Sequence, residues 1–152
     1  MKTTLFLRIA SVLTLIHALL HTIGGVFGKT PPNVQSVVTA MQENHFLAMG
    51  VMRTMWDFHM GLGLVVSIAL TVEGLVFWQL GTLAKSDALR LRPILTTFLV
   101  GYLCFSAIAY RYFFAGPVIT ELLIAACLGL GIASAKEAAG VRPLAVESRG
   151  IS

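Results

Sequence analysis

Charged residues are scarce in this 152-residue chain, and cysteine is scarcer still. Asp, Glu, Lys and Arg together make up only 12% of the residues, and there are two cysteines. A soluble domain carries roughly 25% charged residues, and a disulfide-stapled secreted module needs several cysteine pairs. Hydrophobic residues reach 57%, which is too apolar for a chain that stays solvated without folding. These shortages exclude soluble, disordered and disulfide-framed proteins and indicate an integral membrane protein.

The few basic residues are spread along the chain. The formal net charge of +4 comes from Lys and Arg scattered between apolar runs rather than gathered in one patch. Such scatter is typical of residues that orient membrane spans, whereas a phosphate-binding face needs a basic cluster. We therefore expect the lipid bilayer as the main partner and no nucleic acid.

Four apolar stretches are long enough to cross a hydrocarbon core of roughly 30 Å, which takes about 20 helical residues. They cover residues 4–27, 52–80, 94–113 and 117–135. The first is expected to be retained rather than cleaved as a secretory signal, because histidines interrupt it and no small-x-small motif follows. The sequence thus predicts an all-α integral membrane protein, an antiparallel bundle of four transmembrane helices.

The predicted bundle forms one domain, residues 1–136, and residues 137–152 form a flexible tail. Basic residues favour the cytoplasmic side of a membrane. Placing the N-terminus, the turn at 81–93 and the tail inside gathers eight of the eleven basic residues there: Lys2, Arg8, Lys85, Arg90, Arg92, Lys136, Arg142 and Arg149. We therefore expect a multi-pass protein of the cell membrane with both termini and the tail in the cytoplasm.

The linker between the first two spans has helical periodicity. Pro31 and Pro32 suit a helix start. Apolar residues then recur at spacings of three and four: Val34, Val37, Val38, Met41, His45, Met49 and Met52. This pattern predicts an amphipathic helix over about 33–50 that lies on the outer membrane surface, with His45 in its apolar stripe.

Ionisable residues inside a span are costly, so each one is a candidate for a functional site. With a rise of about 1.5 Å per residue, His21 lies roughly 10 Å below Gly28, and Glu121 lies roughly 6 Å below Pro117. His59 lies roughly 9 Å below Arg53 by the same arithmetic. We therefore predict a pocket in the outer third of the bundle. Its expected ligand-binding residues are His17, His21, His45, Asp57, His59, Arg111 and Glu121.

Glu73 is expected to lie apart from this pocket, roughly 24 Å deeper than Asp57 along the same helix. One hypothesis is a neutral side chain bonded to Thr96, Thr97 or a serine of a neighbouring helix. The other hypothesis is that Glu73 lies on a proton or cation path from the inner side of the membrane.

The predicted pocket suits a metal or a haem. His17 and His21, at positions i and i+4, offer two imidazoles, and His59 and Glu121 complete the three-nitrogen, one-oxygen set that zinc or non-haem iron accepts. Haem b fits between His17 or His21 and His59 in a four-helix bundle. The plainer alternative is that the histidines only make hydrogen bonds between helices.

Two readings need no metal. In the first, the pocket binds a small amphiphile, with Arg111 and His59 on an anionic or carbonyl head. The expected aromatic walls are Tyr102, Tyr110, Tyr112, Phe113 and Phe114. In the second, the chain is an accessory subunit or homo-oligomer that packs through small residues of 129–135. The sequence thus favours an amphiphile-binding or accessory membrane protein, with a haem b- or metal-dependent redox protein as the alternative.

Overall fold

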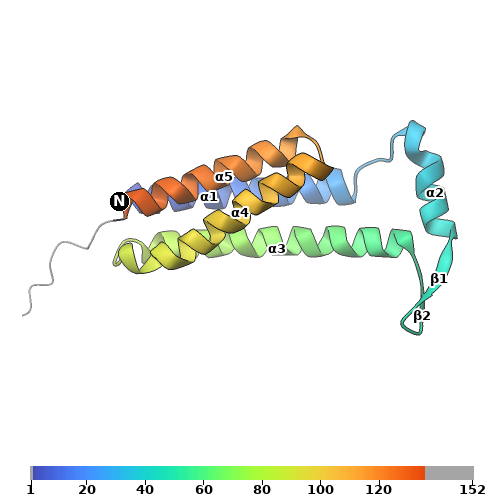
Figure 1. Ribbon diagram of the computed structural model, residues 1–152, viewed down its shortest axis with the longest axis horizontal. Coiled ribbons are helices and arrows are strands. Elements are labelled where there is room, and N and C mark those ends of the chain that lie inside the picture. Colours follow the sequence, from blue (N-terminus) through green and yellow to red (C-terminus); the bar gives the residue numbers. More distant parts are fainter. Residues whose placement is uncertain (1, 136–152) are drawn as a thin grey trace, which may run out of the picture.

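The computed structural model describes residues 2–135, and most of them are helical (Figure 1). The predicted tail, 137–152, lies outside the described residues. The helices are α1 (Lys2–Leu20), which continues as a π-helical stretch (His21–Val26), α2 (Gln35–Glu43), α3 (Met55–Leu83), α4 (Arg92–Tyr112) and α5 (Ala115–Ser134). Two strands, β1 (His45–Ala48) and β2 (Val51–Thr54), precede α3, and single 3₁₀ turns (Pro32–Val34 and Leu89–Leu91) precede α2 and α4.

Four helices are long and apolar enough to cross a membrane: α1 with its π-helical continuation, α3, α4 and α5. Their ends differ from the four predicted stretches by no more than three residues. Long apolar windows limit where such helices can lie, because each needs about 20 residues of low polarity. The helical class and the four long helices are confirmed.

The prediction of one helix over 33–50 is wrong beyond Glu43. The Asn44 side chain donates a hydrogen bond of 2.7 Å to the Ala40 carbonyl and ends α2. Strands β1 and β2 then pair antiparallel, with His45 opposite Thr54. Met49 and Gly50 both have positive φ at the tight turn, which is the geometry that two-residue hairpins prefer. Because nearly every residue near this turn is apolar, some of these residues match a helical spacing by chance.

Helix α3 begins with a capping box. The Thr54 hydroxyl accepts a 3.1 Å hydrogen bond from the Asp57 backbone, and the Asp57 carboxylate accepts one of 2.8 Å from the Thr54 backbone. The two bonds satisfy backbone groups that every helix start leaves free. The hairpin therefore passes directly into α3.

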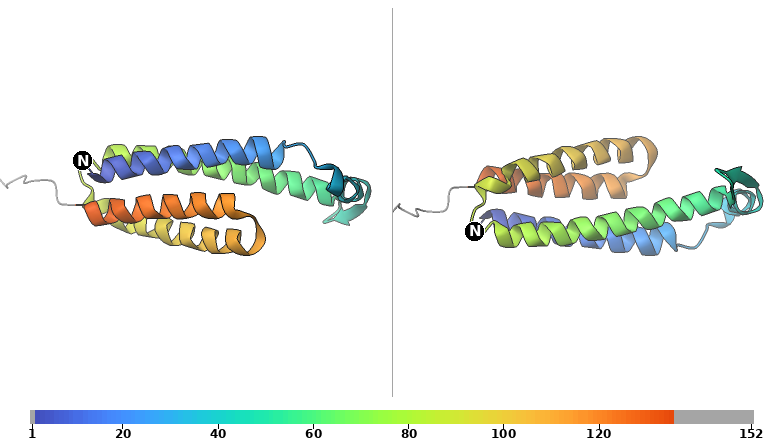
Figure 2. Two further views of the ribbon diagram at one scale, coloured as in Figure 1. Left: turned by 90° about the horizontal axis from the view of Figure 1, so that it is seen from above. Right: turned by 90° about the horizontal axis from the view of Figure 1, so that it is seen from below.

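The long helices form two side-by-side pairs, α1 with α3 and α4 with α5 (Figure 2). Helix α1 also packs against α5, whereas α3 and α4 make much less backbone contact in the described part of the chain. Phe77 of α3 bridges that wider separation, with its ring centroid 4.9 Å from Phe98 and 5.8 Å from Tyr102 of α4. The α4–α5 turn ends short of the start of α3 (Figure 1). Helix α3 therefore projects toward α2 and the hairpin, at what we term the hairpin end.

Close contacts fix the α1–α3 pair. The Ser11 hydroxyl donates a 2.7 Å hydrogen bond to the Gly74 carbonyl, and both residues are buried. A Cβ at Gly74 would lie 2.7 Å from Leu15 Cδ2, so only glycine allows this approach. Away from such contacts, large hydrophobic side chains cover the outer faces of the helices, among them Leu62, Val65 and Ile68 of α3. Their exposure is typical of a surface in contact with lipid.

Candidate functional site

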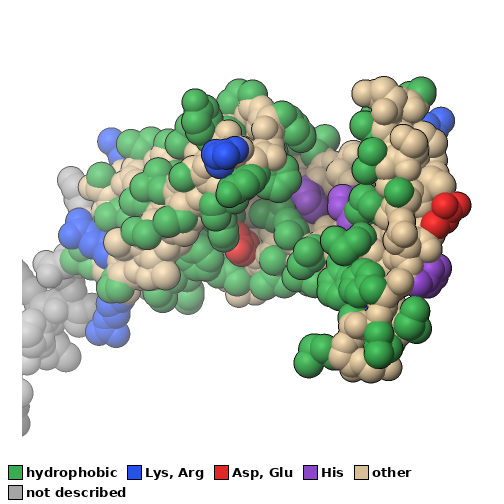
Figure 3. All heavy atoms as spheres, turned by 45° about the vertical axis from the view of Figure 1, so that its right-hand side comes forward, with side chains coloured by type: hydrophobic (Ala, Val, Ile, Leu, Met, Phe, Trp, Pro, Cys, Tyr) green, Lys and Arg blue, Asp and Glu red, His purple; other side chains and the backbone are tan. Residues whose placement is uncertain are grey.

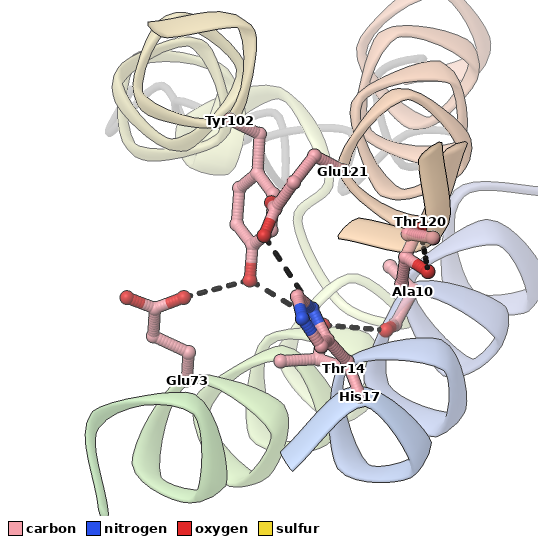
Figure 4. A network of polar contacts seen from close by, with 8 residues as sticks. Ala10, Thr14, His17, Glu73, Tyr102, Thr120 and Glu121 are labelled. Atoms are coloured by element: carbon pink, nitrogen blue, oxygen red, sulfur yellow. Dashed lines mark hydrogen bonds and ion pairs between the residues drawn. The ribbon is translucent and has the colours of Figure 1, made fainter. Parts of the chain in front are cut away.

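A chain of hydrogen bonds connects three of the long helices in the interior of the bundle (Figure 4). The Tyr102 hydroxyl of α4 donates to Glu73 Oε2 of α3 at 2.7 Å. The same hydroxyl lies 3.4 Å from Thr14 Oγ1 of α1, which donates to the Ala10 carbonyl at 2.9 Å. Tyr102 and Thr14 are fully enclosed, with exposed fractions of 1% and 0%. The Glu73 carboxylate is thus held at a defined place between α3 and α4.

His17 of α1 and Glu121 of α5 form the second part of the site, and Figure 4 shows their side chains directed toward each other. His17 Nδ1 lies 3.4 Å from Glu121 Oε1. Within residues 2–135, neither His17 Nδ1 nor Glu121 Oε2 has a hydrogen-bond partner, although both atoms are buried. Buried polar atoms in native proteins are nearly always partnered. These two atoms therefore mark a place in the bundle with spare hydrogen-bonding capacity. Within residues 2–135, Thr4 Oγ1 and Arg8 Nη1, near the start of α1, are also buried without a partner.

We term Glu73, Thr14, His17, Glu121 and His21 the polar row. His21 is its member nearest the hairpin end. Its Nδ1 lies 3.1 Å from Ser67 Oγ of α3, and Ser67 in turn donates to the Gly63 carbonyl at 3.1 Å. Thr14, His17 and His21 are spaced by three and four residues, so they share one face of α1. Both histidines of the first span therefore face neighbouring helices of the bundle.

The other four residues of the predicted pocket lie elsewhere. Asp57 caps α3, and His59 is exposed with its ring centroid 5.3 Å from that of Trp56. His45 is exposed on β1, where its Nδ1 is 2.8 Å from the Glu43 carbonyl. Arg111 is exposed and lies over the Tyr112 ring, 5.3 Å from its centroid. The structure thus keeps His17, His21 and Glu121 of the predicted set within the bundle.

The expected depth of Glu73 was wrong. Glu73, expected far below Glu121, lies beside it, since both join the cluster around Tyr102 and His17 (Figure 4). His59 is fourteen residues from Glu73, or about 21 Å along α3. The long helices do not start at the same height, because α3 projects beyond the α4–α5 turn (Figure 1).

The proposed metal and haem ligands are not assembled. No group of three or more His, Cys, Asp or Glu side chains lies close enough to hold a metal ion within the described residues. His21 contacts Ser67, which is eight residues, or about 12 Å, along α3 from His59. His59 therefore does not face His17 or His21 across a shared gap, and the residues do not fit the expected haem or the four-ligand metal site.

The aromatic residues that were expected to line the pocket do not lie together. Tyr102 is buried in the polar network, whereas the other four aromatic residues are exposed. A shallow, apolar depression at the α4–α5 turn is lined by Tyr110, Phe113, Phe114, Ala115, Val118 and Ile119. The predicted wall thus lies at the turn rather than around the histidines.

Sequence reasoning missed the bond between Glu73 and Tyr102. It assigned Tyr102 to an aromatic wall and sought a threonine or serine partner for Glu73. The available signal was that Tyr102 lies in the middle of an apolar span, where a phenol hydroxyl needs a hydrogen-bond partner.

We expect a double-mutant cycle to show that this bond links α3 to α4. Tyr102→Phe removes the donor and Glu73→Met removes the acceptor. Their coupling should be about 0.6 to 1.7 kcal/mol, the range of side-chain hydrogen bonds within membrane bundles. The free energy of unfolding in mixed micelles titrated with dodecyl sulfate measures it.

The control cycle combines Tyr102→Phe with Glu43→Met, because Glu43 is exposed on α2. Those two effects should add to within about 0.5 kcal/mol. A coupling as small for Tyr102 and Glu73 as for the control pair would show that the bond contributes nothing to the fold.

Comparison with protein-family models, with curated proteins and with solved structures finds no match to this chain, so its candidate site rests on the geometry above.

Proposed function

We propose that this protein is a multi-pass membrane protein that binds a small amphiphile inside its helical bundle. In this proposal the four long helices cross the membrane in alternating directions, with both termini on the cytoplasmic side. The apolar lengths of the helices and their exposed hydrophobic side chains support the crossing. The distribution of basic residues supports the orientation.

The observation that carries the proposal is the buried carboxylate of Glu121. The side chain is 7% exposed, and Oε2 has no hydrogen-bond partner among residues 2–135. An unpaired polar group in an apolar interior costs free energy. A ligand whose polar head hydrogen-bonds Glu121 and His17 would offset that cost.

The surroundings of the site suit an amphiphile. On the face drawn in Figure 3, acidic and histidine side chains are visible among hydrophobic ones. His17 is 13% exposed and Glu73 is half-buried, so the polar row is reachable from outside. A head group can therefore contact the polar row while its apolar tail lies against the hydrophobic helix faces.

Mass spectrometry of molecules that co-purify with the protein in mild detergent tests the proposal. We expect a small amphiphile in about stoichiometric amount with the wild-type protein. Glu121→Leu introduces an apolar side chain of similar size and removes both carboxylate oxygens, so the amphiphile should be lost. Glu43→Leu, at an exposed position on α2, is the matched control and should retain it.

Two outcomes would contradict the proposal. One is the same set of lipids at the same ratio in wild-type, Glu121→Leu and Glu43→Leu protein. The other is a wild-type protein without any stoichiometric amphiphile after extraction. Elution as a single species in size-exclusion chromatography checks that each variant is folded.

A further inference from the structure

We infer that the ligand's head group is a cation, of the class of lipophilic amines and quaternary ammonium compounds. This inference rests on the proposed function, because it specifies the chemistry of the same site.

The interior of the bundle contains two carboxylates, Glu73 and Glu121, on neighbouring sides of Tyr102 (Figure 4). All five arginines that the structure describes make their contacts elsewhere. Arg8 bonds Thr82 and lies over Trp78, Arg53 bonds the Met52 carbonyl, Arg90 pairs with Asp87, Arg92 bonds the Ala135 carbonyl, and Arg111 lies over Tyr112. Among residues 2–135, Glu73 and Glu121 contact a tyrosine and a histidine but no arginine. The site is therefore acidic.

Glu121 supplies the observation that points to a ligand rather than to a packing role. An ionised carboxylate can only accept hydrogen bonds, and one removed from water needs a counter-charge or donors. His17 Nδ1 lies 3.4 Å from Oε1, which leaves Oε2 without a partner among residues 2–135. A positively charged head group next to Oε2 provides the missing charge, and an ammonium N–H also provides the missing donor.

Aromatic rings pack around Tyr102, whose hydroxyl donates to Glu73. The Tyr102 ring lies 5.8 Å from Phe77 and 5.9 Å from Phe105, measured between centroids, and Phe77 lies 4.9 Å from Phe98. The faces of such rings attract cations, and quaternary ammonium ligands bind in aromatic cages. Carboxylates beside aromatic rings form a chemically consistent site for an organic cation with an apolar tail.

This inference reverses the expectation that Arg111 and His59 hold an anionic or carbonyl head. Both residues are exposed and lie apart from the buried acids. An anionic head would meet two carboxylates in the bundle instead of a guanidinium.

Three probes of equal chain length but different charge test the inference: decyltrimethylammonium, decanol and decanesulfonate. Each is titrated in radiolabelled form against the full chain in phosphatidylcholine nanodiscs, with empty nanodiscs subtracted. We expect saturable binding of decyltrimethylammonium at least about tenfold tighter than that of decanol. Decanesulfonate should show no saturable binding, since its charge has the sign of the site.

Glu121→Gln separates charge from shape, because the amide keeps the size and the hydrogen-bonding oxygen of the side chain. It should weaken decyltrimethylammonium binding by about tenfold or more and leave decanol binding nearly unchanged. The matched control Glu43→Gln should bind all three probes as the wild-type protein does. Glu73→Gln is the second test variant and replaces Glu121→Gln if that protein does not fold.

The outcomes distinguish this inference from the proposed function. Equal binding of decanol and decyltrimethylammonium, both lost in Glu121→Leu, would overturn the cation and leave the amphiphile site in place. No saturable binding of decyltrimethylammonium to the wild-type protein would also overturn the cation. The co-purification experiment decides the amphiphile site independently of either result.

Discussion

Replacing Phe77 by alanine is expected to destabilise the bundle by about 3 to 5 kcal/mol, the usual cost of removing a buried phenylalanine ring. Phe77 is fully buried, and its ring contacts Phe98 and Tyr102. Because α3 and α4 make little backbone contact, these rings fill the space between them. Alanine would leave a cavity that neighbouring side chains cannot close without moving the α4–α5 pair.

The free energy of unfolding in mixed micelles titrated with dodecyl sulfate measures this effect. Phe113→Ala is the matched control, since that ring is 67% exposed at the end of α4 and its loss leaves no enclosed cavity. We expect the control to lie within about 0.5 kcal/mol of the wild-type protein. Equal effects of the two substitutions would show that the rings between α3 and α4 do not hold the helix pairs together.

Gly74→Leu is expected to cost about 3 kcal/mol through overpacking. A Cβ at this position would lie 2.7 Å from both Leu15 Cδ2 and Leu15 Cγ, and 3.4 Å from the Leu15 backbone nitrogen. The end of a flexible leucine can turn away, but its Cγ and the backbone of α1 cannot move without separating the helices. The Ser11 bond to the Gly74 carbonyl, 2.7 Å long, would be lost with that separation.

Gly61→Leu, on the same helix, is the control. An added Cβ at Gly61 meets nothing within 4 Å in the described part of the chain. Leucine is a better helix former than glycine, so this variant should be as stable as the wild-type protein or up to about 1 kcal/mol more stable. The prediction fails if Gly74→Leu unfolds at the same dodecyl sulfate fraction as Gly61→Leu.

The candidate site and the packing of the bundle depend on the same helices. Thr14 and His17 come from α1, Glu73 from α3, Tyr102 from α4 and Glu121 from α5. A ligand held by Glu121 and Glu73 would connect the α1–α3 pair with the α4–α5 pair. Binding would then raise the stability of the bundle, because a ligand that prefers the folded state shifts unfolding by mass action.

Part of the site was predictable because it depends on a single helix. The spacing of Thr14, His17 and His21 places them on one face of α1 whatever surrounds that helix, since helical periodicity is a local property. Likewise, the apolar stretches determined the four long helices, because each needs about 20 residues of low polarity to cross a membrane. The hairpin at His45–Thr54 was missed because its residues are so apolar that they match a helical spacing as well as a strand.

The partners across helices were decided by the tertiary structure alone. Glu121 meets His17, and Glu73 meets Tyr102, only because the α4–α5 turn ends short of the start of α3 and leaves the first turns of α3 projecting. Relative height and crossing geometry depend on side-chain packing between helices that are far apart in sequence. The sequence therefore determined the four long helices and which face of α1 is polar, whereas the packing of the helix pairs determined which acidic residues lie together.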